Sequence, residues 1–289
     1  MKSYVCTSIV VLLFVGLLPA LPAHARQELS PSMLSIPVSI EIAGGTASGF
    51  FINNGSCLQL VTARHVLFND PQRTLKASIA ALLCYPTNPA PSQRIEMKLN
   101  LKLLQQQNYI RLDQTNDVAV VRLAKVQKKN RGAGEEVVYP KAMVEVSSGR
   151  DLPVVAIGTD QVKRMDDVFI SNEVFIFGYP SSIGIKQMPQ LDHQKPLLRK
   201  GIVAGKNEAK RTIILDCPSY YGNSGGPVAE VDPGSLGQKS FRIIGIVLQF
   251  VPFQETWVNA THKLSHWEIS NSGYSVVAPI DCVLPLLFK

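Results

Sequence analysis

The stretch Gly222-Asn223-Ser224-Gly225-Gly226-Pro227 places one serine inside a glycine-rich turn. Glycine tolerates positive φ and lets another backbone approach closely, so a turn of this kind can expose the Ser224 hydroxyl. Consecutive backbone N–H groups in such a turn can also converge on one point, which is the arrangement that stabilises a developing oxyanion. Because glycine-rich turns with serine are common in ordinary loops, this stretch needs chemical partners elsewhere in the chain.

Two further stretches, each beside an apolar run, offer those partners. Thr62-Ala63-Arg64-His65 puts His65 directly after an apolar run, and a nucleophilic serine needs a base with a pKa near neutrality. Asn116-Asp117-Val118 puts Asp117 directly before another, where a carboxylate can accept the Nδ1 proton of the base and hold its tautomer. A lone histidine at a strand end is usually structural, and an aspartate there often caps a loop. Asp113 is the alternative carboxylate.

Short runs of strand length cover the chain on both sides of a polar stretch at 125–134. Asn53-Asn54-Gly55-Ser56, between two of these runs, indicates a tight hairpin. Two groups of about six short strands joined by a polar segment predict an all-β protein of two packed barrels. The last residues, 279–288, favour a short helix that Pro285 limits or bends. We expect strands at 36–42, 49–52, 58–62, 78–85, 95–101, 109–112 and 118–123, and then at 173–177, 201–204, 212–216, 227–231, 241–251 and 274–278.

Six motifs in this order resemble the trypsin-like (chymotrypsin-fold) serine proteases, in particular the bacterial branch that includes the HtrA proteases and the glutamyl endopeptidases. The chain order His, Asp, Ser is that of the chymotrypsin-like fold, and the resemblance runs from about Ser35 to the C-terminus. The motifs are Gly45-Thr46-Ala47-Ser48-Gly49-Phe50, Thr62-Ala63-Arg64-His65, Asn116-Asp117-Val118-Ala119-Val120, Phe177-Gly178-Tyr179-Pro180, Gly222 to Pro227, and Gly245-Ile246-Val247.

The resemblance implies two six-stranded antiparallel β-barrels with the active site in the cleft between them. The first barrel would take residues 26–124, a connector 125–168, and the second barrel with the C-terminal segment 169–289. Ser224 would be the nucleophile, His65 the general base and acid, Asp117 the orienting carboxylate, and the N–H groups of Gly222 and Ser224 the oxyanion hole. The implied function is an exported serine endopeptidase that works through an acyl-enzyme. The alternative is a catalytically silent binding or scaffold protein on the same fold.

The chain departs from the pattern of these proteases at the activation and specificity positions. Asn223 stands where animal digestive and clotting proteases carry an aspartate that pairs with a newly cut N-terminus, so activation by that ion pair is not expected. No PDZ module is expected after the protease region. The pocket positions aligned on Ser224 carry no acidic residue, which favours a small or medium apolar substrate side chain. Phe250 replaces a frequent glycine, which would either narrow the pocket or shift the path of the peptide. The candidate substrate-binding residues are Ser219, Tyr220, Val247, Leu248, Gln249 and Phe250.

The first 25 residues predict a secretory signal peptide. Lys2 precedes the apolar run Ile9 to Leu18, and Ala23-His24-Ala25 fits a signal peptidase site with cleavage after Ala25. An uncleaved membrane anchor is the alternative, although the run is short for a full span. We therefore expect a secreted or periplasmic protein.

Composition limits the partners and cofactors. The formal charge is +7, but its lysines and arginines are dispersed, so a nucleic-acid or anionic-surface binder is the weaker reading and peptide or protein substrates are expected. No cofactor is expected, and no metal site, because no cysteine pair or histidine cluster has ligand spacing. Removing the signal peptide leaves four of the five cysteines, which are disulfide candidates in an exported chain. Cys57–Cys84 is the favoured pairing because both lie in the first barrel; the other two are Cys217 and Cys282.

Overall fold

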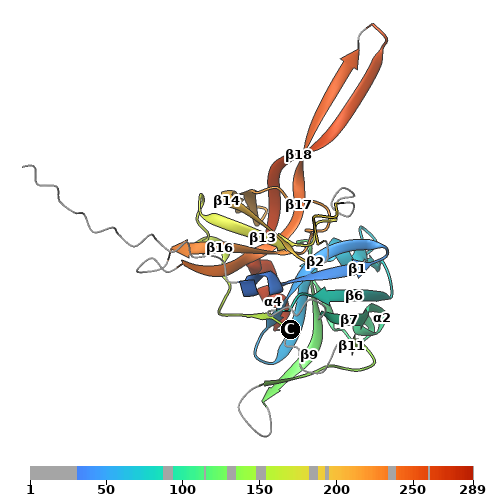
Figure 1. Ribbon diagram of the computed structural model, residues 1–289, viewed down its shortest axis with the longest axis vertical. Helices are drawn as coiled ribbons and strands as arrows, with labels where there is room; N and C mark the ends of the chain where they lie inside the picture. Colours follow the sequence, from blue (N-terminus) through green and yellow to red (C-terminus); the bar gives the residue numbers. More distant parts are fainter. Residues whose placement is uncertain are drawn as a thin grey trace, which may run out of the picture.

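The computed structural model describes residues 31–86, 94–113, 115–128, 135–147, 154–181, 188–192, 195–233, 239–259 and 261–288. The predicted signal peptide lies outside the described residues. The all-β prediction is confirmed, because strands dominate the described residues and every helix among them is short (Figure 1). No helix within the described ranges is long and apolar enough to cross a membrane. The helical elements are η1 (Pro31–Ser35), α1 (Arg64–Leu67), α2 (Leu101–Gln106), η2 (Met165–Asp167), η4 (Ile280–Cys282) and α4 (Leu284–Leu287).

The first unit is a curled ten-stranded sheet in the order β10-β9-β3-β2-β1-β6-β7-β11, with β12 on β2 and β8 on β9. It has more strands than expected because β10, β11 and β12, which lie within the range 125–168, pair with β9, β7 and β2. A separate pair, β4 (Phe68–Asn69) with β5 (Thr74–Leu75), follows α1. The ten strands are β1 (Pro37–Ile42), β2 (Gly45–Asn53), β3 (Cys57–Ala63), β6 (Ile79–Cys84), β7 (Ile95–Asn100), β8 (Ile110–Leu112), β9 (Val118–Lys128), β10 (Glu135–Val138), β11 (Val144–Val146) and β12 (Ala156–Gly158).

The second unit is a closed barrel of six strands in the order β13-β14-β15-β18-β17-β16, as predicted. Inward-facing aliphatic residues such as Val174, Ile176 and Val203 are fully buried and alternate with more exposed ones, which is the period of a strand with one buried face. The six strands are β13 (Glu173–Gly178), β14 (Leu197–Asn207), β15 (Thr212–Asp216), β16 (Pro227–Pro233), β17 (Lys239–Asn259) and β18 (Leu264–Pro279).

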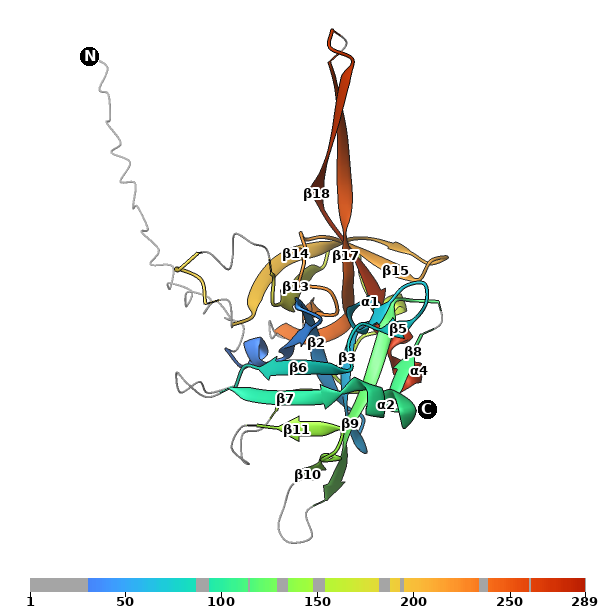
Figure 2. The same cartoon turned by 90° about the vertical axis from the view of Figure 1, so that its right-hand side faces the viewer.

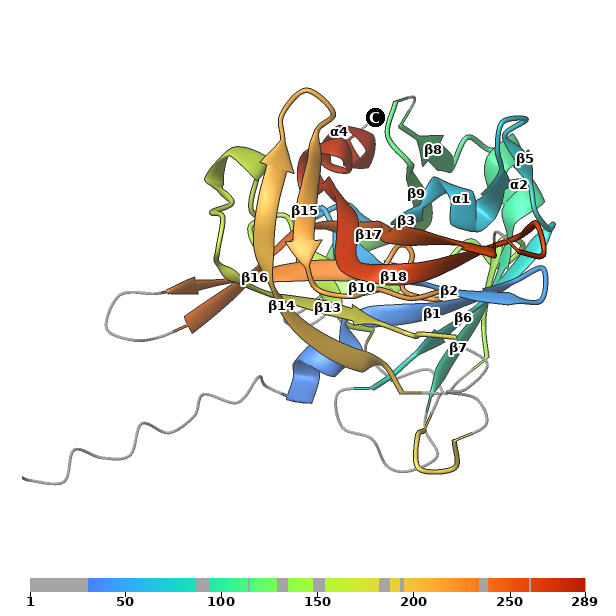
Figure 3. The ribbon, with the colours of Figure 1, turned by 90° about the horizontal axis from the view of Figure 1, so that it is seen from above.

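The C-terminal segment ties the second unit to the first. The predicted short helix is present as α4, which lies between β15 and β8 in the view of Figure 3. The backbone carbonyl of Leu287 accepts hydrogen bonds from Asn54 Nδ2 at 2.7 Å and from Gln59 Nε2 at 3.0 Å. Since Gln59 is buried on β3, these bonds satisfy both a buried amide and the open end of the helix.

Two strands of the second barrel continue far beyond it. Residues 252–259 of β17 pair with residues 264–271 of β18 to form a two-stranded ribbon that projects from the body of the protein (Figures 1 and 2). We call residues 252–271 the arm. The sequence analysis did not predict it, because its strand predictions end at 251 and resume at 274.

All four described cysteines are free thiols, so the expected Cys57–Cys84 disulfide does not form. The sheet order explains this: Cys57 lies on β3 and Cys84 on β6, with β2 and β1 between them. Strands spaced about 4.8 Å apart place those backbones well beyond the roughly 7 Å limit for Cα atoms joined by a disulfide.

Candidate active site

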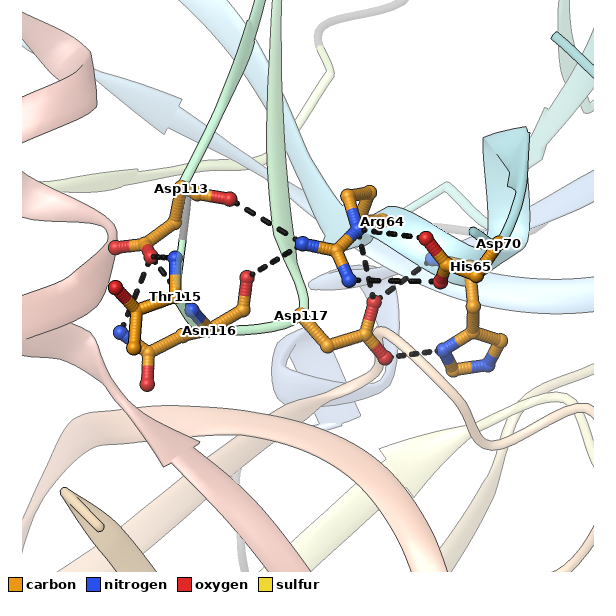
Figure 4. A network of polar contacts seen from close by, with 7 residues as sticks. All are labelled: Arg64, His65, Asp70, Asp113, Thr115, Asn116 and Asp117. Atoms are coloured by element: carbon orange, nitrogen blue, oxygen red, sulfur yellow. Dashed lines mark hydrogen bonds and ion pairs between the residues drawn. The ribbon is translucent and has the colours of Figure 1, made fainter. Parts of the chain in front are cut away.

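The pairing of β3 with β9 brings His65 and Asp117 together. Its register aligns Ala63 with Val118, so the residues just beyond each strand meet. The backbone N–H of His65 donates to Asp117 Oδ1 at 2.8 Å, and the Nδ1 atom of His65 is hydrogen-bonded to Asp117 Oδ2 (Figure 4). The carboxylate therefore holds both the backbone and the ring of the histidine, and the ring's Nε2 atom points away from it.

Arg64 fixes the far side of this carboxylate. Its guanidinium lies 3.3 Å from Asp70 and 4.0 Å from Asp117 Oδ1, and it donates to the backbone carbonyls of Asp113 and Asn116 at 3.3 Å (Figure 4). Asp113, the alternative carboxylate, caps its own loop by accepting from the N–H of Asn116 at 2.6 Å. The structure therefore pairs His65 with Asp117, and Asp113 serves the loop that carries Asp117.

The pKa of Asp117 lies below its ordinary value. Burial is the largest single influence and raises the pKa, but the hydrogen bonds and charge of His65, together with the charge of Arg64, outweigh it. The Asp117 side chain is 25% exposed and that of His65 is 38% exposed, so the histidine remains accessible from solvent while the carboxylate is mostly covered. Asp117 is thus held as a carboxylate, the form that orients an imidazole.

The turn carrying Ser224 depends on glycine at two positions. Gly222 has φ of +90° and Gly225 has φ of +82°, a region that side chains disfavour. A Cβ on Gly225 would lie 2.2 Å from Thr62 Oγ1 and 2.8 Å from the nitrogen of Ala63. The turn therefore packs directly against the end of β3, two residues before His65, and only glycine permits that approach.

Hydrogen bonds on the carbonyl side fix two peptide planes of this turn. The carbonyl of Tyr221 accepts from the N–H of Ser181 at 2.8 Å, and the carbonyl of Asn223 accepts from the N–H of Gly226 at 2.9 Å. In a trans peptide the N–H points opposite to the carbonyl, so the N–H groups of Gly222 and Ser224 are directed away from those donors. Neither N–H donates a hydrogen bond to any described residue.

Ser48 on β2 connects this turn to the first sheet, a role that the sequence motif around it did not reveal. Its buried Oγ donates to the carbonyl of Gly222 at 2.7 Å and accepts from the N–H of Tyr179 at 2.9 Å. Its backbone N–H donates to the carbonyl of Ser224 at 3.0 Å. One side chain from the first sheet thus holds both the turn and the residue that follows β13. In the sequence, the only sign of this role was a serine among small residues.

The hydroxyl of Ser224 donates to the backbone carbonyl of Leu248 at 3.1 Å. Within the described residues no hydrogen bond joins it to His65. Ser224 is partly buried, and rotation about its Cα–Cβ bond between staggered rotamers moves the oxygen without moving the turn. The nucleophile candidate is therefore seen in a rotamer directed to β17.

The candidate substrate-binding residues flank the turn on two elements. Ser219 is buried, and its hydroxyl is bonded to Ser275 at 2.8 Å, a partner that the sequence analysis did not identify. On β17, Val247 is buried and Gln249 is exposed. The Phe250 ring meets the exposed ring of Tyr221 edge to face at 5.9 Å, which joins β17 to the Ser224 turn.

Asn223 lies inside the turn instead of reaching out to a terminus. It is buried, and its Oδ1 accepts from the N–H of Tyr220 at 3.0 Å. No group of three or more potential metal ligands occurs among the described residues.

Comparison with known protein families identifies the family of this chain. A model of the trypsin-like peptidase domain matches residues 47–236, a range that contains His65, Asp117 and Ser224. The chain belongs to the trypsin-like peptidase family.

Among solved structures the chain is similar to Deg5, with 21% identity, a TM-score of 0.46, and 90% of this chain and 88% of that one covered. It is also similar to the HtrA-type protease AlgW with a tripeptide, at 14% identity and a TM-score of 0.47, covering 89% of this chain and 61% of AlgW. Rv3671c from M. tuberculosis H37Rv in an inactive form gives 12% identity and a TM-score of 0.46, with 92% and 91% covered. No curated protein sequence matches the chain.

Proposed function

We propose that this protein is an exported serine endopeptidase with His65, Asp117 and Ser224 as its catalytic triad. The observation that carries the proposal is that Asp117 is hydrogen-bonded to both the backbone N–H and the ring of His65. Beside this pair lies the Ser224 turn, whose peptide planes are fixed by hydrogen bonds. The family of trypsin-like peptidases supports serine peptidase chemistry on peptide or protein substrates. Export follows from the signal-peptide pattern of the first 25 residues.

In the proposed reaction the Ser224 hydroxyl first rotates from Leu248 toward His65. Nε2 of His65 then takes the hydroxyl proton while Oγ attacks the substrate carbonyl carbon. The oxyanion accepts hydrogen bonds from the N–H groups of Gly222 and Ser224, each typically worth about 3 kcal/mol in the transition state. His65 gives its proton to the leaving amine, and a water molecule then releases the acyl group by the same steps in reverse.

The Ser224 turn does not need an ion pair with a newly cut N-terminus to become ordered. Asn223 is neutral and satisfied within its own turn, so the oxyanion N–H groups are oriented by internal bonds. Removal of the signal peptide alone is expected to give active enzyme.

For substrate preference we propose a small or medium apolar side chain next to the cleaved bond. No acidic residue is present at Ser219, Tyr220 or the Val247–Phe250 wall, so Lys or Arg would find no counter-charge. The contact of Phe250 with Tyr221 restricts the space for large side chains. Phe250→Gly is expected to widen acceptance toward larger residues in a peptide-library digest.

Labelling with a fluorophosphonate tests the proposal directly. The chain from residue 26 should be labelled, Ser224→Ala should not, and the exposed control Ser56→Ala should be labelled like the parent. If the parent protein folds but is not labelled, the result would instead support a catalytically silent binding protein. The hydrogen bond of the Ser224 hydroxyl to Leu248, and not to His65, is the observation in favour of this second function.

A further inference from the structure

The arm exposes apolar side chains on both of its faces. Directly opposed residues of an antiparallel pair share a face, so Phe253, Trp257 and Leu264 lie on one face and Val258, Trp267 and Ile269 on the other. Each of these six side chains is at least half exposed, from 51% for Phe253 to 72% for Val258. A ribbon of this composition buries none of its large side chains on the protein itself, and isolated two-stranded hairpins are marginally stable in water.

The arm also has free backbone edges. The last partner of β17 on β16 is Ile246, opposite Pro227, and β18 pairs with β15 only from Tyr274 to Val277. Beyond these points, within the described residues, each strand of the arm pairs only with the other. Unpaired strand edges bind further strands through main-chain hydrogen bonds.

Two glutamates of the arm favour a cationic binding partner. Glu255 and Glu268 are directly opposed on the face that carries Trp257, and both are exposed. Like charges placed opposite each other destabilise a strand pair. No ion pair to either carboxylate occurs among the described residues, so a cationic side chain laid beside them would relieve the repulsion.

The free edge of β17 begins at the candidate active site. Leu248, whose carbonyl accepts from Ser224, and Phe250 precede the arm on the same strand. An extended chain bound in the active site is therefore within a few residues of the arm.

We propose that the arm is an exosite that binds an extended segment of the polypeptide substrate by strand addition, with apolar and basic residues alternating in that segment. This rests on the proposed peptidase function. Successive side chains of a third strand would meet the two faces in turn, and the ribbon would become a three-stranded sheet. Insertion into a bilayer fits less well, because open strand edges leave N–H and carbonyl groups unsatisfied in hydrocarbon.

Tryptophan fluorescence measures this binding selectively, because the only two tryptophans of the chain, Trp257 and Trp267, both lie in the arm. In Ser224→Ala protein, a twelve-residue peptide of alternating Val and Lys should shift the emission to shorter wavelength, and alternating Val and Glu should bind at least about tenfold more weakly, equivalent to about 1.4 kcal/mol. The double variant Glu255→Lys/Glu268→Lys should reverse this order. A control with the same change in net charge, Glu136→Lys/Glu145→Lys on exposed positions of the first sheet, should not.

Cleavage provides the second measurement. Replacing residues 253–270 by Asn-Gly joins Pro252 to Asn271, which are already opposed, through a two-residue turn. This deletion should leave kcat/KM for a fluorogenic tetrapeptide unchanged. For a long peptide that extends the same cleavage sequence with the Val-Lys segment, tested at either end, it should lower kcat/KM by about tenfold.

The proposal is overturned if neither peptide changes the emission, if both bind equally, or if the deletion affects long and short substrates alike. A blue shift caused only by lipid vesicles, or a dimer in sedimentation that the deletion dissolves, would assign the arm to a membrane or to a second copy and would also overturn it. Peptide binding does not need hydrolysis, so loss of fluorophosphonate labelling would refute the peptidase function separately.

Discussion

Replacing Ser48 by alanine tests whether the first sheet holds the Ser224 turn in place. The substitution removes one buried hydroxyl that donates to the carbonyl of Gly222 at 2.7 Å and accepts from the N–H of Tyr179 at 2.9 Å. The backbone bonds of Ser48 to Ser224 and to Thr62 remain. Only the link through the side chain is lost.

The size of the effect follows from the two backbone groups left unpaired. Each lost bond is worth about 1 kcal/mol net, and each buried group without a partner costs about 1–3 kcal/mol. Because Ser48 is fully buried, water does not replace the hydroxyl, and we expect the free energy of unfolding to fall by about 2–4 kcal/mol. For a chain of this length the melting temperature should drop by about 4–16 °C.

The unfolding assay should be urea denaturation followed by far-UV circular dichroism, because both tryptophans lie in the arm and do not report on this core. The kcat should fall, by about tenfold, with little change in KM, since a looser Gly222 weakens a bond made only in the transition state. Ser56→Ala is the matched control, with a change within about 0.5 kcal/mol at an exposed site. Equal stability and equal kcat for the two variants would refute this account of the turn.

Three further predictions use the same geometry. Gly225→Ala should prevent or strongly destabilise folding, measured by soluble yield and circular dichroism, because its Cβ would lie 2.3 Å from the carbonyl oxygen of Ser48; a variant as stable as the parent would show that the turn sits differently. Asp117→Asn should lower kcat by about 10⁴-fold through loss of the required histidine tautomer. The pKa of Asp117 is lower in the folded protein than the unfolded value of about 3.9. Ionised Asp117 therefore stabilises the fold above that pH, and this stabilisation is lost as the pH falls through the folded pKa. The difference in unfolding free energy between the parent and Asp117→Asn should accordingly shrink between pH 7 and pH 3. In the native protein only the partly exposed Cys57 should react with a thiol reagent, whereas all four thiols should react after unfolding. The reason is that burial raises the pKa of Cys84 to about 12 and that of Cys217 to about 11. Four reactive thiols in the native protein would contradict the buried packing.

Much of the strand framework could be predicted because burial on one face leaves a periodic pattern in the sequence. The predicted strands at 36–42, 95–101 and 212–216 correspond to β1, β7 and β15. The strand β10 was missed because all four of its residues are exposed, so it has no alternation to detect. The arm was missed for a related reason: its apolar residues point to both faces and neither face is buried.

The sequence by itself determined which residues are the candidates for catalysis. His65 and Asp117 flank runs that pair as β3 and β9, and Ser224 lies in a turn where glycine is required at positive φ. Those are local constraints, which can be recognised from the residue type and from its position relative to a strand. Only the tertiary structure decided that Ser48 holds the turn and that Cys57 and Cys84 are kept apart by two strands, because both depend on which strands are neighbours. Likewise, the free edge leading from Leu248 into the arm depends on where β16 and β15 end, a long-range pairing that no short stretch of sequence encodes.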